Sequence, residues 1–223
     1  MAPGTASDAA TASPTPDGIV ARPAGPSDLG DAARVLVAAF PREFHLLFSS
    51  RQRTAEEVIH HLLCCDYAEG RGIWVAWDGE RTIGAMLLES PPQFRQRHTW
   101  RLALHVAWRH VGLRGLPRLA LVLLLPRYAP QPGEVYVRAI GVTPPYRGRG
   151  AGTLLLRCAE DWGRQHHKKW LGLHVNSGNA RAHALYRRMG YADRGCRLSL
   201  LMWLTLRQRG SRYMTKPLRN TRG

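Results

Sequence analysis

The sequence has no apolar run long enough to cross a membrane. Its longest internal run, residues 119–125, falls well short of the roughly 20 residues that a spanning helix requires. Cysteine is also scarce, and the four cysteines form neither a Cys-x-x-Cys pair nor the dense spacing of a secreted disulfide scaffold: Cys64, Cys65, Cys158 and Cys196. We therefore expect no membrane span, and a reducing cytoplasm as the compartment.

Acidic residues are few relative to basic ones. Lys and Arg total 32 against 16 Asp and Glu, which gives a formal net charge of +16. Such an excess attracts polyanions, but the arginines are scattered through every segment and are not concentrated in a patch with interleaved aromatics. We favour the interpretation that the basic excess reflects the general amino-acid composition of proteins from the source. Nucleic-acid binding stays open as an alternative.

The length of 223 residues and the apolar content of 44% suit one domain with a full core. Residues 1–17 lack apolar periodicity and predict a disordered leader. The domain is expected over residues 18–206, with a helical insert over 91–133 interrupted by glycine and proline. Residues 207–223 carry six basic residues and no acid, which favours a flexible basic tail.

The chain between the leader and the tail predicts a mixed α/β fold. Strands are expected at 18–22, 73–77, 82–89, 134–142, 170–175 and 197–206, and the second and third form a hairpin through Asp78-Gly79. Helices are expected from Ser27 or Asp28 to Phe40, and over 55–67, 150–165 and 179–188. His60, His61, Cys64 and Cys65 fall on the second helix with no further ligand set, so we expect no metal site.

A glycine-rich turn stands between the strand over 134–142 and the helix that follows. The run Arg147-Gly148-Arg149-Gly150-Ala151-Gly152 offers backbone N–H groups and the positive end of a helix dipole to an anion. Thr153 occupies the place of the third glycine that a dinucleotide loop requires, and no Gly-Lys-Ser/Thr triplet is present. The turn therefore predicts a phosphate site that is neither a dinucleotide loop nor a nucleoside triphosphate loop.

Two segments resemble the GNAT superfamily of N-acetyltransferases. Residues 140–152, Ile-Gly-Val-Thr-Pro-Pro-Tyr-Arg-Gly-Arg-Gly-Ala-Gly, are similar to its acetyl-CoA motif, Arg/Gln-x-x-Gly-x-Gly/Ala. Residues 179–191 resemble its downstream Asn-x-x-Ala-x-x-Leu-Tyr-x-x-x-Gly-Phe segment. The resemblance implies a mostly antiparallel central sheet with helices on both faces and strands that splay at the acyl-CoA site. It also implies acetyl-CoA as cosubstrate, and an acetyl group moved to a primary amine by direct attack in a ternary complex.

Carried over residue by residue, the resemblance assigns Tyr186 as the general acid that protonates the leaving thiolate. The backbone of the strand end would hold the pantetheine arm, the glycine-rich turn the pyrophosphate, and Asn179 the CoA arm. The implied cofactor-binding residues are Ile140, Gly141, Val142, Arg147, Gly148, Arg149, Gly150, Ala151, Gly152, Thr153 and Asn179.

His174 is the first candidate for the general base, with two rivals on the preceding strand. Residues 173–179 resemble ribosomal-protein N-terminal acetyltransferases, in which a glutamate stands at the position of His174. Histidine titrates near neutrality and can accept the amine's proton, but a strand histidine can equally be a packing residue. Glu134 and Tyr136 on the preceding strand are rivals, because other family members place a catalytic carboxylate along it.

The resemblance leaves the acceptor amine and the oligomeric state open, although homodimers are common among such families. An alternative function is a non-catalytic acyl-CoA-binding module of the same fold, or a basic protein that binds a partner or nucleic acid. The phenol of Tyr186 beside an intact phosphate turn favours the enzyme, since a scaffold has no need of an acid at that place.

Overall fold

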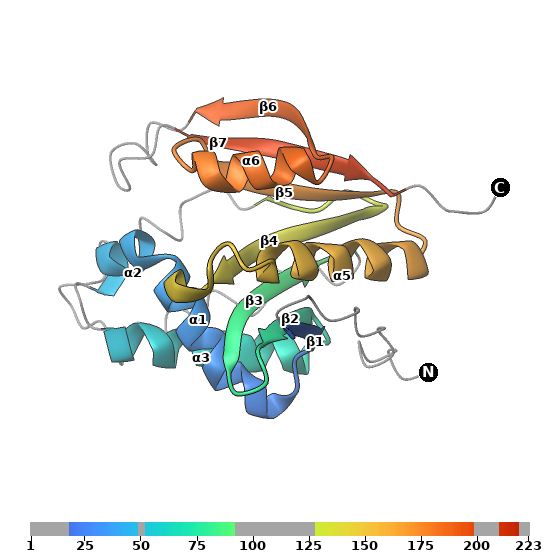
Figure 1. Ribbon diagram of the computed structural model, residues 1–223. Helices are drawn as coiled ribbons and strands as arrows, with labels where there is room; N and C mark the ends of the chain where they lie inside the picture. The colour runs from blue at the N-terminus through green and yellow to red at the C-terminus, as the bar shows by residue number, and fades with distance from the viewer. Residues whose placement is uncertain (1–17, 49–51, 92–127, 199–209, 219–223) are drawn as a thin grey trace.

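One mixed sheet runs through the computed structural model, which describes residues 18–48, 52–91, 128–198 and 210–218 (Figure 1). The strand order is β1-β2-β3-β4-β5-β7-β6. Every described neighbour pair is antiparallel except β4 with β5, which is parallel. The strands are β1 (Val20–Pro23), β2 (Gly72–Trp77), β3 (Thr82–Glu89), β4 (Glu134–Val142), β5 (Trp170–Asn176), β6 (Ala192–Leu198) and β7 (Gly210–Pro217).

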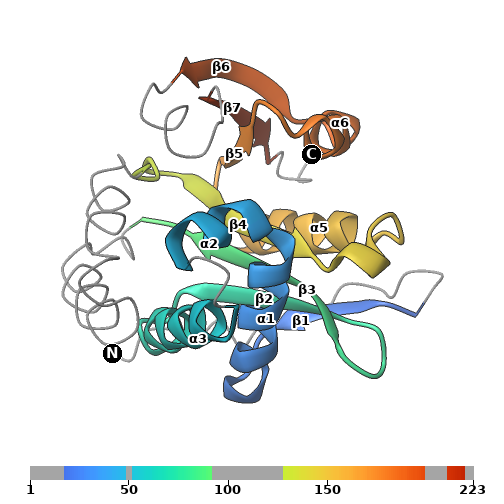
Figure 2. The ribbon, with the colours of Figure 1, turned by 90° about the vertical axis from the view of Figure 1, so that its left-hand side faces the viewer.

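Helices cover both faces of the sheet, as Figures 1 and 2 show from two sides. On one face lie α1 (Leu29–Ala39) and α3 (Gln52–Ala68), with α2 (Pro41–Phe48) beside them. The other face is covered by α5 (Ala151–Gln165) and α6 (Ala180–Arg188). Short 3-10 turns, η2 (Pro26–Asp28) and η3 (Pro144–Tyr146), precede α1 and α5. The predicted fold class is therefore confirmed.

Strand β2 shows how the sheet divides the core into two layers. Ile73 and Val75 pack with α1 and α3, whereas Trp74 and Ala76 pack with α5. Alternate residues of a strand point to opposite faces, so a strand buried on both sides needs an unbroken apolar run. No helix in the described ranges is long and apolar enough to span a membrane.

The termini of the domain differ from the prediction. The final strand was expected over 197–206, but β6 starts at Ala192 and ends at Leu198, and residues 199–209 lie outside the described ranges. The flexible-tail prediction is wrong for Gly210–Pro217, which forms β7 between β5 and β6. Both strands are mostly polar and show no apolar alternation. Their position in the sheet is therefore determined by backbone pairing with neighbouring strands.

Other predictions fall outside what the structure describes, or miss an element. The leader (1–17) and nearly all of the expected insert (91–133) before Tyr128 are not described. The first helix, expected to reach Phe40, ends at Ala39, and the second short helix α2 was not expected. Pro41 is the first residue of α2, a position at which its missing N–H costs nothing.

Candidate active site

Strands β4 and β5 separate at the middle of the sheet. Their parallel pairing runs from Glu134–Trp170 to Val137–Leu173 and goes no further. Beyond it, β4 pairs only with β3, and β5 pairs only with β7. The pairing of β4 with β3 also shifts register at this level, between Leu87 and Leu88. A bulge bends a strand and strengthens its twist, which accounts for the divergence visible in Figure 1.

The fork opens a cleft of about 840 Å³ between the two strand ends. Its walls come from the ends of β4 and β5, the α1–α2 junction and the start of α6. Backbone N–H and C=O groups on the two facing edges have no partner strand here and can bind a ligand that carries amides. Ile140, on β4, lines this cleft and the next cavity along the strand.

The second cavity, of about 380 Å³, lies at the glycine-rich turn. Gly148 and Gly150 have positive φ angles of 93° and 90°, which a residue with a Cβ rarely adopts. Gly150 is the N-cap of α5 and supplies no side chain to its first turn. The first N–H groups of the helix are therefore left for an anion. The lining includes Gly141, Val142, Ala151, Gly152 and Thr153.

The two arginines of the turn have different surroundings. Arg147 Nε donates to the carbonyl oxygen of Val142 at 3.1 Å, and its Nη2 to that of Ala39 at 3.4 Å, so this guanidinium ties β4 to α1. The Arg149 guanidinium lies 5.2 Å from the ring centre of Tyr146. Arg181, which no motif in the sequence marked, also reaches the turn, and its Nη2 lies 3.3 Å from the place of a Cβ on Gly148. Arg147 and Arg181 both line the cavity at the turn.

Tyr186 lies on α6, where it lines both cavities. The helix begins at Asn179, whose side chain accepts a hydrogen bond from Ala182 N at 3.1 Å, the predicted cap. Only 7% of Tyr186 is exposed, and burial raises the pKa of its phenol to about 12. The phenol is therefore protonated at neutral pH, as a general acid must be before it acts.

His174 is the first residue of β5 beyond the fork, and it lines the same cleft as Tyr186. Its Nδ1 lies 3.0 Å from the phenol oxygen of Tyr136. The rings of Tyr128 and Tyr213 lie 4.9 and 5.0 Å from the imidazole, centre to centre. Contacts with the three tyrosines thus hold the imidazole at the wall of the cleft.

The two rivals for the role of base are less accessible. Glu134 is fully buried, and its carboxylate accepts hydrogen bonds from Tyr213 Oη at 2.7 Å, Tyr128 Oη at 2.9 Å and Gln131 N at 2.9 Å. Tyr136 is 8% exposed, and burial, followed by the charge of Glu89, raises the pKa of its phenol. Neither residue lines either of the two cavities described above, whereas His174 lines the cleft at the fork.

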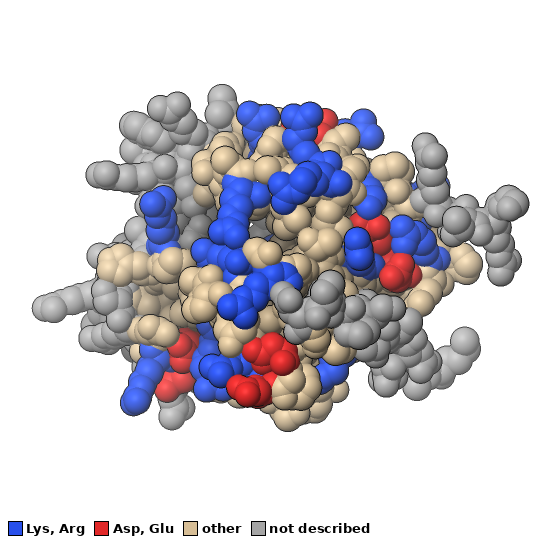
Figure 3. Space-filling view, in the orientation of Figure 1, with Lys and Arg blue, Asp and Glu red and all other residues tan. Residues whose placement is uncertain are grey.

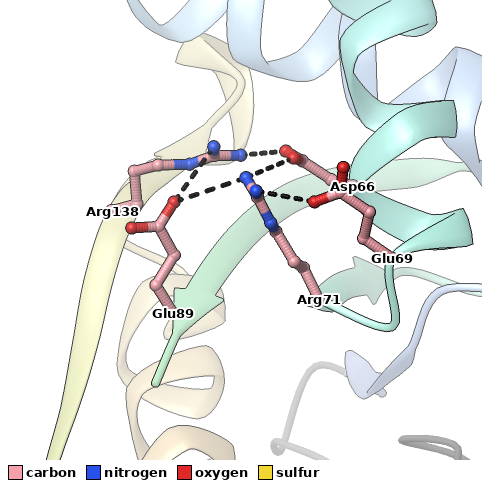
Figure 4. Close-up of polar contacts among 5 residues, drawn as sticks. All are labelled: Asp66, Glu69, Arg71, Glu89 and Arg138. Carbon is pink, nitrogen blue, oxygen red and sulfur yellow. Dashed lines mark hydrogen bonds and ion pairs between the residues drawn. The ribbon is translucent and has the colours of Figure 1, made fainter. Parts of the chain in front are cut away.

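A cluster of ion pairs borders the cleft where β4 bulges (Figure 4). The guanidinium of Arg138, which lines the cleft, contacts Asp66 and lies 3.1 Å from Glu89. Arg71 binds Asp66 at 2.8 Å and Glu69 at 2.7 Å. Burial opposes the charge of Arg138, but the two carboxylates keep its pKa above the usual value. Arg138 is 72 residues from Asp66 in sequence, so its place in the cluster had no local signal.

Metal ligands do not gather in the described part of the chain, where no group of three or more His, Cys, Asp or Glu side chains could hold an ion. Cys64 Sγ lies 3.5 Å from His60 Nε2 on α3, one helical turn apart.

Comparison with known proteins agrees with this geometry. The model of the Acetyltransferase (GNAT) family matches residues 119–191, a segment that includes the glycine-rich turn and the helix that carries Tyr186. Streptothricin acetyltransferase of Streptomyces lavendulae is 36% identical over 81 residues. That match covers 36% of this chain and 43% of the relative, so the chain spans less than half the length of the curated protein that it matches.

Solved acetyltransferase structures share the fold. The ribosomal-protein-S18-alanine N-acetyltransferase of Escherichia coli superposes with a TM-score of 0.57 at 16% identity, covering 92% of this chain and 96% of that one. The histone acetyltransferase HPA2 and related acetyltransferase of Corynebacterium glutamicum gives 0.62 at 22% identity, covering 92% and 97%. The resemblance inferred from the sequence is thus confirmed, in the motifs by sequence and in the fold by structure.

Proposed function

On the premise that this chain has the motifs and the fold of the GNAT acetyltransferases, we propose that it moves an acetyl group from acetyl-CoA to a primary amine. The observation that carries the proposal is the continuity of the two cavities. Ile140, Arg147, Asn179 and Tyr186 line both, so a ligand with its pyrophosphate on the glycine-rich turn can extend its arm into the fork.

The pantetheine arm of acetyl-CoA suits the fork because it carries two amide groups. The free edge of β4 beyond Val137 can pair with them as a strand would. The thioester then lies near the apex of the fork, between His174 and Tyr186. An amine that enters the cleft attacks the thioester carbon directly, because both substrates are held at once.

The reaction moves one proton from the amine to sulfur. The amine nitrogen forms a bond to the carbonyl carbon, and the C–S bond of the tetrahedral intermediate breaks. We assign His174 to accept the amine's proton and Tyr186 to donate one to the departing thiolate. The charges left on the two side chains are neutralised by proton exchange with solvent before the next turnover.

The pKa of Tyr186, about 12, lies above the reference value of roughly 8.5 for a thiol, so complete transfer to a hydrated thiolate is unfavourable. Burial changes the comparison, because the same apolar surroundings that raise the pKa of the phenol also raise that of a thiol formed there. Tyr186 therefore stabilises the thiolate by a hydrogen bond as the C–S bond lengthens, and transfers the proton as the charge on sulfur develops.

The test is a panel of amine acceptors incubated with acetyl-CoA, with release of free thiol as the readout. The panel includes a streptothricin, peptides with the N-termini of ribosomal proteins, and polyamines, because the relatives' names cover two of these classes. We expect thiol release with at least one class, and acetyl-CoA binding by calorimetry. Binding without turnover on any acceptor would favour the non-catalytic module, and absence of binding would refute both.

A further inference from the structure

The fork opens between a guanidinium and an imidazole. The last pair of β4 with β5 is Val137 with Leu173, so Arg138 and His174 are the first residues beyond it on their strands. Residues that follow one register pair stand on the same face of a sheet, and paired strands lie about 5 Å apart. Both side chains line the cleft. When an amine reaches His174, a group a few bonds away on the same molecule can therefore reach Arg138.

The guanidinium of Arg138 is held in place from behind. Asp66 on α3 and Glu89 on β3 both pair with it, as Figure 4 shows. The two carboxylate side chains are covered, at 7% and 8% exposed, whereas 32% of the Arg138 side chain is exposed. A guanidinium has several N–H donors, so two ion pairs leave donors for a further anion. The cleft thus meets the cation of this cluster in a fixed position, and its carboxylates lie behind.

Another wall of the cleft adds a second cation. Arg42, the second residue of α2, is exposed and has no ion-pair partner among the described residues. Arg147 also lines the cleft, but it lines the cavity at the turn as well and so belongs to the cosubstrate end. In Figure 3, basic side chains spread over the middle of this face, and most of the acidic side chains drawn lie lower or to the right.

Acidic side chains do not balance these cations, because none of the described residues that line the cleft is Asp or Glu. An acceptor with several ammonium groups would bring its remaining charges beside Arg42 and Arg138, where like charges repel. A carboxylate near the amine would instead form charge-assisted hydrogen bonds with a guanidinium. By neutralising that carboxylate, the guanidinium also favours the uncharged form of the amine, which is the form that attacks.

We propose that the acceptor is an aminocarboxylate, whose carboxylate binds Arg138 and Arg42 while its amine reaches His174. The proposal rests on the acetyl transfer proposed above and narrows the class of its acceptor. The carboxylate can belong to a free amino acid or to an acidic side chain next to the N-terminus of a peptide, since both sources offer the same group to the arginines. Polyamines are disfavoured.

The test compares acids with their uncharged amides. Alanine against alaninamide tests the free amino acid, and the peptide amides Ala-Asp-Ala and Ala-Asn-Ala test the acidic side chain. With acetyl-CoA and thiol release as the readout, kcat/KM referred to the neutral amine should be roughly tenfold or more higher for the acid in at least one pair. Spermidine should be poorer than the preferred acid. Calorimetry of the same ligands with the CoA-bound protein makes the comparison without turnover.

Two variants test the arginines. Arg138→Gln should bring the ratio of acid to amide close to one, and Arg42→Ala should lower it severalfold. Arg42 lies outside the ion-pair cluster, so its variant keeps the test decisive if Arg138→Gln does not fold. Arg187→Ala is the matched control, because it removes the same charge from an exposed residue of α6 that does not line the cleft. It should keep the preference for the acid.

Each outcome decides the question. Equal use of acid and amide in both pairs, or a faster reaction of spermidine, overturns the aminocarboxylate and leaves acetyl transfer standing. A preference that persists in both arginine variants also overturns it, and so does a loss in Arg187→Ala as large as in Arg42→Ala. Selective binding of an acid without thiol release from any acceptor would refute the proposed function and leave the carboxylate site standing.

Discussion

The phenol oxygen of Tyr136 lies 3.0 Å from Nδ1 of His174, and this contact joins the two strands at the apex of the fork. Because Nδ1 is engaged, a proton taken from the amine must go to Nε2. The neutral imidazole can accept it there only in the tautomer that carries its hydrogen on Nδ1, which then donates to the tyrosine oxygen. In the proposed reaction, Tyr136 therefore acts through His174.

The first prediction concerns His174 as the base. The rate constant kcat/KM should fall on the acidic side, because a charged imidazole cannot accept the amine's proton. His174→Ala should remove that limb and lower the rate without weakening acetyl-CoA binding. His174→Glu should recover part of the rate and move the limb to lower pH. An acidic limb that persists at full rate in the alanine variant would exclude this histidine.

Tyr136→Phe tests the positioning role. The ring stays, but the hydrogen bond that selects the tautomer is lost, so we expect kcat to fall by about tenfold and acetyl-CoA affinity to stay the same. The acidic limb should persist, since the base is still present. A pH–rate profile is the measurement, and loss of the limb in this variant would contradict a purely positioning role for Tyr136.

Tyr186→Phe tests the acid. The variant keeps the buried ring and loses the proton, so kcat should fall by roughly 10² to 10⁴ while acetyl-CoA binding is spared. Single-turnover kinetics with the true acceptor is the appropriate measurement. Because burial raises the pKa of this phenol to about 12, the wild type should show no alkaline loss from its ionisation below about pH 11. Unchanged turnover would refute the assignment.

Gly152→Ala tests the phosphate turn with little disturbance of the empty protein. A Cβ at this position meets Leu185 and Val142 at 3.7 and 3.8 Å, which is ordinary contact, whereas Gly150 has a φ of 90° and any substitution there strains the backbone. At a hundred times its dissociation constant, acetyl-CoA should stabilise the wild type by about 2.7 kcal/mol. Thermal unfolding should show this increase lost in the variant. If the variant retains it, the phosphate lies elsewhere.

The sequence predicts the parts of the fold whose signals are local. The cap at Asn179, the Asp78-Gly79 hairpin and the glycine-rich turn are each written within a few residues, and each is where it was expected. The same holds for the place of Tyr186 on its helix and beside the cavity at the turn, whereas the binding of a phosphate there stays a prediction.

What the sequence could not give depends on contacts between distant segments. Strand β7 is polar and enters the sheet through pairing with β5, so its own pattern resembles that of a tail. Likewise Arg138 reaches Asp66, 72 residues earlier, and Tyr136 reaches His174, 38 residues later.

Gly172 gives the last prediction, on stability. A Cβ at this position would lie 1.9 Å from Oε1 of Glu134 and 2.8 Å from Oη of Tyr213, so Gly172→Ala must displace a buried carboxylate from its donors. Overpacking and a broken hydrogen bond together predict a loss of about 3 kcal/mol in the free energy of unfolding. Chemical denaturation measures this loss.

Gly30→Ala is the control, since a Cβ on this α1 residue has no neighbour within 4 Å and should be neutral or slightly stabilising. Adding Glu134→Ala to Gly172→Ala makes room for the methyl group. The double variant should therefore lose less stability than the sum of the losses in the two single variants. Full additivity, or an unchanged stability of Gly172→Ala, would show that the strand tolerates the methyl group without moving Glu134.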